Sequence, residues 1–310
     1  MELHGVHHIT AISGDAPANV EFYVGVLGLR MVKKTVNQDD PTVYHLFYAD
    51  EQGSPGSDLT FFEYPGTGRG LPGAGMVHRI VWRVGSDAAL GFWEERLVGA
   101  GRDPVRTDGS LRFSDPEGLE HELTVYDGRD AALIADAPDV PREHALQGFD
   151  GVRAYATEPE RSAPLLGDVL GFQGGQDGHW EVRGEQRGGY FAWDPAPPIQ
   201  PIQGAGSVHH VAFATRREEQ EAWQQHVAGS GLARPTSVID RFYFESIYFR
   251  EPNGVLFELA TMGPGFGADE DPAHLGERLS LPPRFERMRA QVEQTLTPLP
   301  NPRADRAAAE

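Results

Sequence analysis

The feature that most constrains this chain of 310 residues is a structural unit that its sequence repeats four times. Each copy opens with a short apolar strand pattern, continues with a helix pattern that ends at glycine, and closes with segments rich in Tyr, Phe, Thr and Val. The opening strands are predicted at 5–12, 76–84, 151–157 and 207–214, the helices at 17–28, 87–101, 160–171 and 217–231, and the closing strands at 57–64, 116–125, 187–194 and 252–260. The repeat predicts an α+β fold of four βαβββ modules.

Connections rich in Gly, Pro or acidic residues divide the four modules into two pairs along the chain. The predicted parts are an N-terminal domain at 1–126 with modules at 4–64 and 76–126, a linker at 127–149, a C-terminal domain at 150–262 with modules at 151–194 and 206–260, and an extension at 263–310. The extension is expected to contain a helix near 284–295 and a flexible tail from Pro298 onward.

Composition excludes several classes of partner. The net charge of −19 argues against binding to nucleic acid or to an anionic membrane, because both need a basic face. No apolar run approaches the roughly 20 residues that span a bilayer, and the N-terminus lacks the pattern of a signal peptide. The chain has no cysteine, so a cytoplasmic location is expected, and any metal ion must be held by His, Asp or Glu.

Two His-His dipeptides stand at matching places in the repeat, His7-His8 in module one and His209-His210 in module four. Because side chains alternate along a strand, we expect one histidine of each pair to face the cup of the sheet and the other to face away. The position of His8 and His210 is aligned with Arg79 in module two and Ala154 in module three. Only the first and fourth modules therefore offer an imidazole there.

The closing strands add a carboxylate. The aligned positions in modules one to four are Glu63, Glu122, Ala192 and Glu258. If His8, His210 and Glu258 form one site, modules one and four must pair in space, and modules two and three must pair with each other without a metal ion.

Two histidines and one carboxylate on one side of a metal ion form the arrangement of non-haem Fe(II) oxygenases, which leaves positions open for a substrate and O2. Whether Glu63 or Glu122 takes part stays open from these residues alone. With Glu63 as a fourth ligand, the site would be the two-histidine, two-carboxylate type of an isomerase.

The chain resembles the vicinal oxygen chelate superfamily, which includes glyoxalase I, bleomycin-resistance proteins and extradiol dioxygenases, and within it the hydroquinone ring-cleaving branch. The stretches that carry this resemblance are HHIT (7–10), FYVGVLGLRMVKKTVN (22–37), YHLFYADEQGSPGSDLT (44–60), HHVAFA (209–214) and FESIYFREPNGVLFE (244–258). The resemblance implies two cupped mixed β-sheet barrels, with metal ligands from the first and fourth modules: His8, His210 and Glu258. Catechol-cleaving members use the third and fourth modules, which Ala154 excludes here.

The resemblance also implies polar groups around the metal ion. Tyr248 and Arg241 match substrate-facing residues of the branch, and His7, Thr10 and His209 are expected to support them. Tyr248 could hydrogen-bond a substrate or oxygen intermediate, Arg241 could stabilise negative charge, and an imidazole could pass protons near neutral pH.

The expected function is an Fe(II)-dependent dioxygenase that opens the ring of a hydroquinone with O2. Two alternatives stay open: a glyoxalase-like lyase or isomerase that uses another divalent ion and a second carboxylate, and a binding protein without catalysis. Mn(II), Zn(II) or Ni(II) could replace iron in isolated protein. The substrate, the cleavage position and the oligomeric state are not fixed by the sequence, although many members of the superfamily are homodimers.

Overall fold

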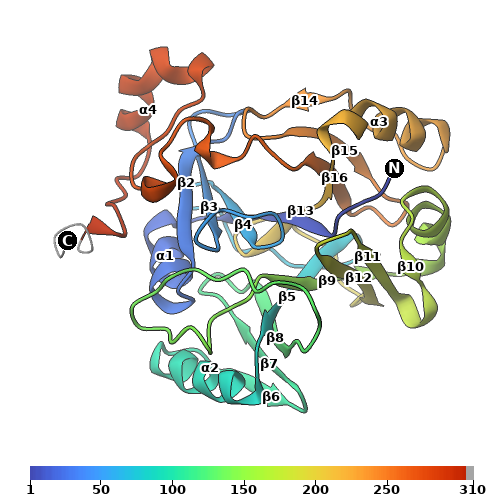
Figure 1. The fold of residues 1–310 in the computed structure, drawn as a ribbon, viewed down its shortest axis with the longest axis horizontal. Coiled ribbons are helices and arrows are strands. Elements are labelled where there is room, and N and C mark those ends of the chain that lie inside the picture. The colour runs from blue at the N-terminus through green and yellow to red at the C-terminus, as the bar shows by residue number, and fades with distance from the viewer. Residues whose placement is uncertain (305–310) are drawn as a thin grey trace.

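The computed structural model describes residues 1–304, and its strands form two mixed sheets of eight strands each (Figure 1). The first sheet is built from modules one and four, and the second sheet from modules two and three. This confirms the α+β class, the four modules and the predicted pairing of module one with module four. The two sheets therefore do not follow the two halves of the chain, and the division into domains 1–126 and 150–262 stays a prediction.

The first sheet has the strand order β14-β15-β16-β13-β1-β4-β3-β2. Module one supplies β1 (Val6–Ser13), β2 (Arg30–Val36), β3 (Tyr44–Ala49) and β4 (Asp58–Glu63), and module four supplies β13 (Ser207–Thr215), β14 (Ile239–Asp240), β15 (Glu245–Arg250) and β16 (Leu256–Thr261). At its centre β1 and β13 pair antiparallel, and each continues outward into a parallel neighbour, β4 or β16.

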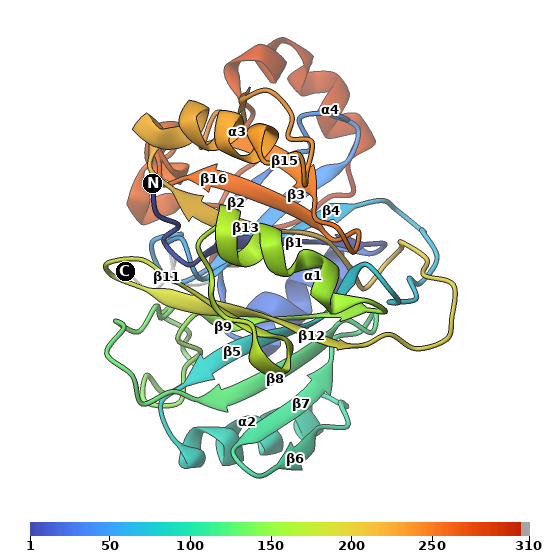
Figure 2. The same cartoon turned by 90° about the vertical axis from the view of Figure 1, so that its right-hand side faces the viewer.

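The second sheet has the order β10-β11-β12-β9-β5-β8-β7-β6, and β5 and β9 form its antiparallel centre. Its strands are β5 (Met76–Val84), β6 (Val105–Thr107), β7 (Ser110–Ser114) and β8 (Glu120–Val125) from module two, and β9 (Phe149–Ala156), β10 (Gln173–Gly174), β11 (His179–Arg183) and β12 (Gly188–Pro195) from module three. Figures 1 and 2 show the second sheet and α2 below the first sheet, with α3 and α4 above it.

The four predicted helices are present, but they are of two kinds. They comprise α1 (Ala16–Val20) with a π-helix at Glu21–Val26, α2 (Asp87–Gly99), a 3-10 turn at Pro159–Ser162 with a π-helix at Pro164–Val169, and a 3-10 turn at Arg217–Glu219 with α3 (Gln220–Gly229). In the π-helices the N–H of Leu27 bonds to the carbonyl of Phe22, and that of Leu170 to Leu165, five residues earlier. No helix within residues 1–304 is long and apolar enough to cross a membrane.

The C-terminal extension packs against the outer strands β2 and β3 of the first sheet. It contains 3-10 turns at Phe266–Ala268, Pro272–His274 and Pro283–Met288, followed by α4 (Arg289–Thr295). The ammonium of Lys33, which is fully buried, is paired with Asp269 at 2.8 Å and with Glu270. A charge buried to this degree needs such partners, so the extension is fixed to β2.

The segment after α4 is also bound to the first module. The carbonyl of Leu299 accepts from Lys34 Nζ at 3.1 Å, and Arg303 is paired with Glu51 at 2.7 Å. The flexible tail expected from Pro298 onward is therefore held against the protein as far as Arg303. The rest of that expectation concerns residues 305–310, which lie outside the described residues.

One apolar core joins the two sheets, and a buried hydrogen-bond chain crosses it. Trp82 donates its indole N–H to His121 Nδ1 at 3.1 Å, so Nε2 of His121 carries the ring proton and meets the hydroxyl of Tyr23 at 3.0 Å. Tyr23 in turn donates to Asp115 Oδ2 at 2.9 Å. Burial lowers the pKa of His121 to about 3, which keeps its ring neutral.

We expect Tyr23→Phe to destabilise the protein by about 1–3 kcal/mol, because His121 loses its partner and Asp115 loses one donor inside the core. Urea unfolding of the two proteins would measure the difference. A matched control is Tyr155→Phe, whose hydroxyl makes no hydrogen bond within the described residues and whose loss should cost less than about 0.5 kcal/mol. Equal effects of the two substitutions would contradict a structural role for the chain.

Candidate metal centre

The two His-His pairs lie at β-bulges where β1 and β13 meet. The pairing runs from Val6 opposite Phe213 to His8 opposite Ala212, which leaves His7 as an extra residue on β1. His209 is the extra residue on β13 in the same way. A bulge breaks the alternation of side chains and re-aims them. In module four the expectation that one histidine faces away from the cup is wrong, because His209 and His210 line the same cavity, whereas in module one His8 lines it and His7 does not. His7 Nδ1 lies 2.9 Å from His8 Nδ1, and His209 Nδ1 lies 2.8 Å from His210 Nδ1.

The second sheet has bulges at the same two places, and they show which residues of modules two and three correspond to His8 and His210. Its extra residues are His78 on β5 and Asp150 on β9. The counterparts of His8 and His210 are the next residues, Arg79 and Gly151. Ala154, which the sequence alignment placed there by matching the Gly-Val of 151–152 to that of 5–6, lies three residues beyond Gly151, so the aligned position was wrong. Glycine has no side chain, so module three still offers no ligand.

The parallel pairs locate the carboxylate position in the same way. Ala212 lies two residues beyond His210 and pairs with Glu258 on β16. Thr10 lies two residues beyond His8 and pairs with Thr60 on β4. The counterpart of Glu258 in module one is therefore Thr60 and not Glu63, which lies three residues further along β4 and pairs with Ser13. Glu63 is itself buried. Burial raises its pKa.

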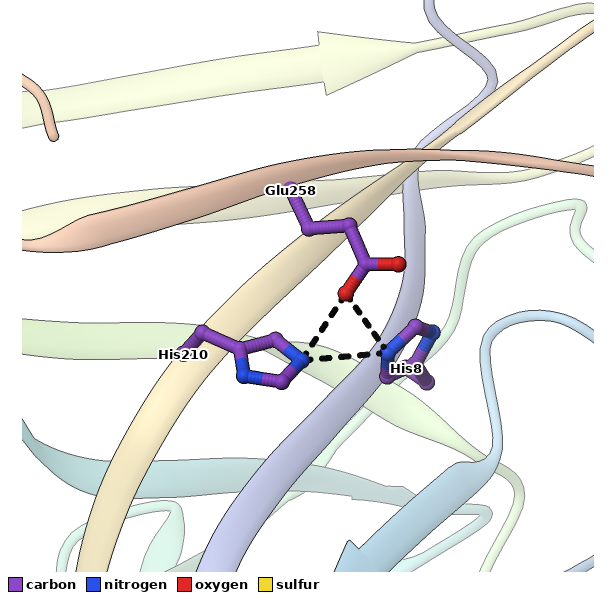
Figure 3. A group of neighbouring side chains, drawn as sticks. All are labelled: His8, His210 and Glu258. Atoms are coloured by element: carbon purple, nitrogen blue, oxygen red, sulfur yellow. Dashed lines mark hydrogen bonds and ion pairs between the residues drawn. The ribbon is translucent and has the colours of Figure 1, made fainter. Parts of the chain in front are cut away.

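His8, His210 and Glu258 converge on one point (Figure 3). Glu258 Oε2 lies 3.1 Å from His8 Nε2 and 2.8 Å from His210 Nε2, and the two imidazole nitrogens are 3.4 Å apart. Ligand atoms held about 2.0–2.2 Å from one ion, at right angles to each other, are roughly 3 Å apart. The three atoms thus fit one face of a metal coordination sphere. No other group of this kind occurs within residues 1–304.

Each of these three side chains is held by a neighbour. The hydroxyl of Ser246 donates to the second carboxylate oxygen of Glu258. His8 and His210 each direct Nδ1 at the Nδ1 of the preceding histidine. With Nε2 on a metal ion, the Nδ1–H of His8 donates to His7, whose own Nε2–H is left to donate to the carbonyl of Thr261. Such partners fix the ring orientation of a metal ligand.

The charges around the site favour a cation. Burial opposes ionisation of Glu258, but the two adjacent imidazoles hold its pKa well below the usual value, so it is a carboxylate. Burial also opposes protonation of His8, but Glu258 outweighs it and raises the pKa of His8. A metal ion would displace that proton and neutralise Glu258 in its place. Burial lowers the pKa of His7 to about 3 and that of His209 to about 4, which keeps both neutral as acceptors.

In the second sheet a guanidinium stands where the first sheet can hold a metal ion. Arg79, the counterpart of His8, is paired with Glu122, the counterpart of Glu258, at 3.2 Å. Arg112 lies 3.2 Å from the other oxygen of Glu122. Glu122 is therefore neutralised without a metal ion, as the pairing of modules two and three predicted, and it takes no part in the candidate site.

A cavity of about 400 Å³ opens onto the three ligand atoms. Of the residues predicted to support the site, Thr10, His209, Arg241 and Tyr248 line it, and His7 lies behind His8. Arg241 Nε donates to the hydroxyl of Tyr248 at 3.2 Å, and Arg241 is held by Asp39 at 2.9 Å. Burial raises the pKa of Tyr248, so the hydroxyl keeps its proton.

Sequence reasoning missed several residues of the site. They are Ser246, which orients Glu258, and the cavity-lining residues His45, Thr60, Phe47, Phe62 and Phe244. The signal for Ser246 was present, because it alternates with Tyr248 on one strand and thus shares its face. Without the register between β15 and β16, that signal could not be connected to Glu258.

A fold of paired βαβββ modules defines a protein of the vicinal oxygen chelate type, and its two histidines and one carboxylate form a group that could hold a metal ion. The family model of the Glyoxalase/Bleomycin resistance protein/Dioxygenase superfamily matches residues 5–123. The chain is 38% identical to "Putative ring-cleaving dioxygenase MhqA" of Bacillus subtilis, over 96% of this chain and 100% of that protein. It is 33% identical to "Chlorohydroquinone/hydroquinone 1,2-dioxygenase" of Sphingobium indicum, over 95% of this chain and 96% of that protein.

A solved structure of a "putative dioxygenase" from Bacillus subtilis has a TM-score of 0.88 at 38% identity, covering 96% of this chain and 98% of that one. The chain belongs to the vicinal oxygen chelate superfamily, and within it to the branch that contains these ring-cleaving dioxygenases. This confirms the resemblance on which the sequence expectations were based.

We expect Glu258→Gln and His8→Ala to lose the bound divalent metal ion, since each removes one of three ligand atoms. Ser246→Ala should retain the ion with an affinity about 10–100-fold lower, because the ligand stays but its orienting partner is lost. Metal content after dialysis and a competitive chelator titration would measure both effects. Glu63→Gln is the control and should bind metal like the parent; loss of the ion in that variant would place the site elsewhere.

Proposed function

We propose that the protein is an Fe(II)-dependent dioxygenase that opens the ring of hydroquinone-type aromatic diols with O2. The observation that carries the proposal is the count and placement of ligand atoms: two imidazoles and one carboxylate on one side, and a cavity on the other. Three protein ligands on one face are the arrangement of non-haem Fe(II) oxygenases. The names of the relatives support the same reaction class.

Iron at this site would supply positions for a substrate hydroxyl and for O2, and a path for electrons from ring to oxygen. The reaction balances with O2 as the only oxidant. The carbon–carbon bond beside a hydroxylated carbon breaks, and one oxygen atom goes to each of its two carbons. A hydroquinone thereby gives a ring-opened acid that also carries an aldehyde.

The residues of the chain have separate tasks in this reaction. Tyr248 keeps its proton and offers its hydroxyl to an oxygen atom within the cavity, while Arg241 places a positive charge beside it. His209 lines the cavity with a neutral ring that accepts from His210 at Nδ1, which leaves its Nε2–H to donate a hydrogen bond to a substrate oxygen. The aromatic rings of Phe47, Phe62 and Phe244 exclude water around the substrate ring.

The two alternatives are less well supported. A glyoxalase-like lyase was expected to use a second carboxylate, Glu63, but Thr60 occupies the position in module one that could supply it. A binding protein without catalysis would not need three buried, converging ligand atoms. Iron as the physiological metal, the cytoplasmic location and the oligomeric state stay predictions.

An oxygen electrode tests the proposal. Protein reconstituted with Fe(II) without air should consume one O2 per hydroquinone, methylhydroquinone or chlorohydroquinone added. Glu258→Gln should be silent, because it loses a ligand, and Glu63→Gln should be as active as the parent. Stoichiometric bound iron with no oxygen uptake from any diol would contradict the proposal and favour a reaction without O2.

A further inference from the structure

His45, on β3 of module one, is a polar residue that lines the cavity and has no role in the proposed reaction. Its Nε2 lies 2.9 Å from the hydroxyl of Thr60, which lies 2.8 Å from the hydroxyl of Thr10. Thr10 and Thr60 are both completely buried. A ring held by a chain of buried hydroxyls has a fixed orientation, which a site for binding a particular ligand requires.

Two aromatic rings enclose the imidazole. The ring centres of Phe47 and Phe62 lie 4.0 Å and 4.4 Å from that of His45. Both phenylalanines also line the cavity. A polar group in such apolar surroundings is costly unless it is hydrogen-bonded. His45 satisfies one ring nitrogen through Thr60, and the other nitrogen, Nδ1, has no hydrogen-bond partner within residues 1–304.

The register of the first sheet relates His45 to the metal site. Phe47 and Thr60 lie opposite each other in module one, as Tyr248 and Glu258 do in module four. Two residues along, His45 occupies the place that Ser246 has in module four. Ser246 donates to the ligand Glu258, whereas His45 bonds to Thr60, which is no ligand. The wall of the cavity formed by β3 and β4 of module one thus has the same strand register as the wall formed by β15 and β16 of module four. His45, however, is not bonded to a candidate metal ligand.

The two walls lie on opposite sides of the seam between β1 and β13. His45 and the three ligand residues line the same cavity, so a substrate whose first hydroxyl is at the ligand atoms can direct its ring toward the wall that carries His45. A second hydroxyl at the far end of that ring then meets an imidazole nitrogen. In a catechol the second hydroxyl is next to the first and cannot reach that wall.

We propose that His45 Nδ1 hydrogen-bonds the hydroxyl of a para-diol that is remote from the metal site, and that it thereby selects hydroquinones over phenols and catechols. This inference rests on the proposed function, because it takes the ring to be bound through its other hydroxyl at His8, His210 and Glu258. A buried hydrogen-bonding group discriminates strongly against an analogue that lacks its partner. Thr60 and Thr10 are positioning residues in this arrangement, since they act through His45.

Binding measurements without air test the inference separately from turnover. The metal-loaded protein is titrated calorimetrically with hydroquinone and with phenol, which share the metal-directed hydroxyl and differ only in the remote one. The parent should bind hydroquinone about tenfold more tightly than phenol, as one net hydrogen bond allows. In His45→Phe, which keeps a flat ring between Phe47 and Phe62, this ratio should fall to about one.

His45→Asn should restore most of the ratio, because its amide nitrogen replaces Nδ1. A matched control is His179→Phe in the second sheet, which should leave the ratio unchanged. Metal content, measured in every variant, reports whether the site is intact. An unchanged ratio in His45→Phe would overturn the role of His45 while leaving the dioxygenase proposal standing. Failure of the metal-loaded parent to bind hydroquinone at all would overturn both.

Discussion

The antiparallel pairing of β1 with β13 is the interaction on which the rest of this structure depends. It joins His8 to His210 across 202 positions of sequence, and it is reciprocal, with His8 opposite Ala212 and Thr10 opposite His210. One bulge on each strand turns the paired histidines toward the same region. Glu258 then comes into reach through the parallel pairing of β16 with β13. The candidate metal site thus depends on the pairing of two modules, and neither module contains it alone.

The two sheets differ in how they neutralise a buried glutamate. Each carries a buried glutamate at the same place in its closing strand, Glu258 or Glu122. A buried carboxylate must be neutralised. In the second sheet the guanidinium of Arg79 does this permanently. In the first sheet the imidazoles of His8 and His210 lie beside Glu258, and a metal ion bound there would supply the positive charge. Within residues 1–304, only the first sheet therefore carries a candidate metal site.

Much of the fold and of the candidate site could be predicted from the sequence, because the residues that determine them recur at matching places in the four modules. The four modules, the pairing of modules one and four, and the three ligand residues follow from residue types compared between copies. The bulges could not be predicted, because β1 and β13 are buried on both faces and their sequences have no alternation of apolar and polar residues that an extra residue would interrupt. The alignment matched similar pairs of residues, Gly-Val in module three and Phe-Glu in module one, and so placed Ala154 and Glu63 three residues beyond the true counterparts, Gly151 and Thr60. His45 was missed for a related reason: its relation to the site exists only through the register of β3 with β4.

The most direct test of the shared centre is anomalous X-ray scattering from crystals of the protein loaded with Fe(II) or Mn(II). One strong peak is predicted per chain, about 2.0–2.2 Å from His8 Nε2, His210 Nε2 and Glu258 Oε2, with no peak beside Glu122 in the second sheet. A peak that involves Glu63, or one held within a single module, would contradict the claim that the seam between the first and fourth modules creates the site.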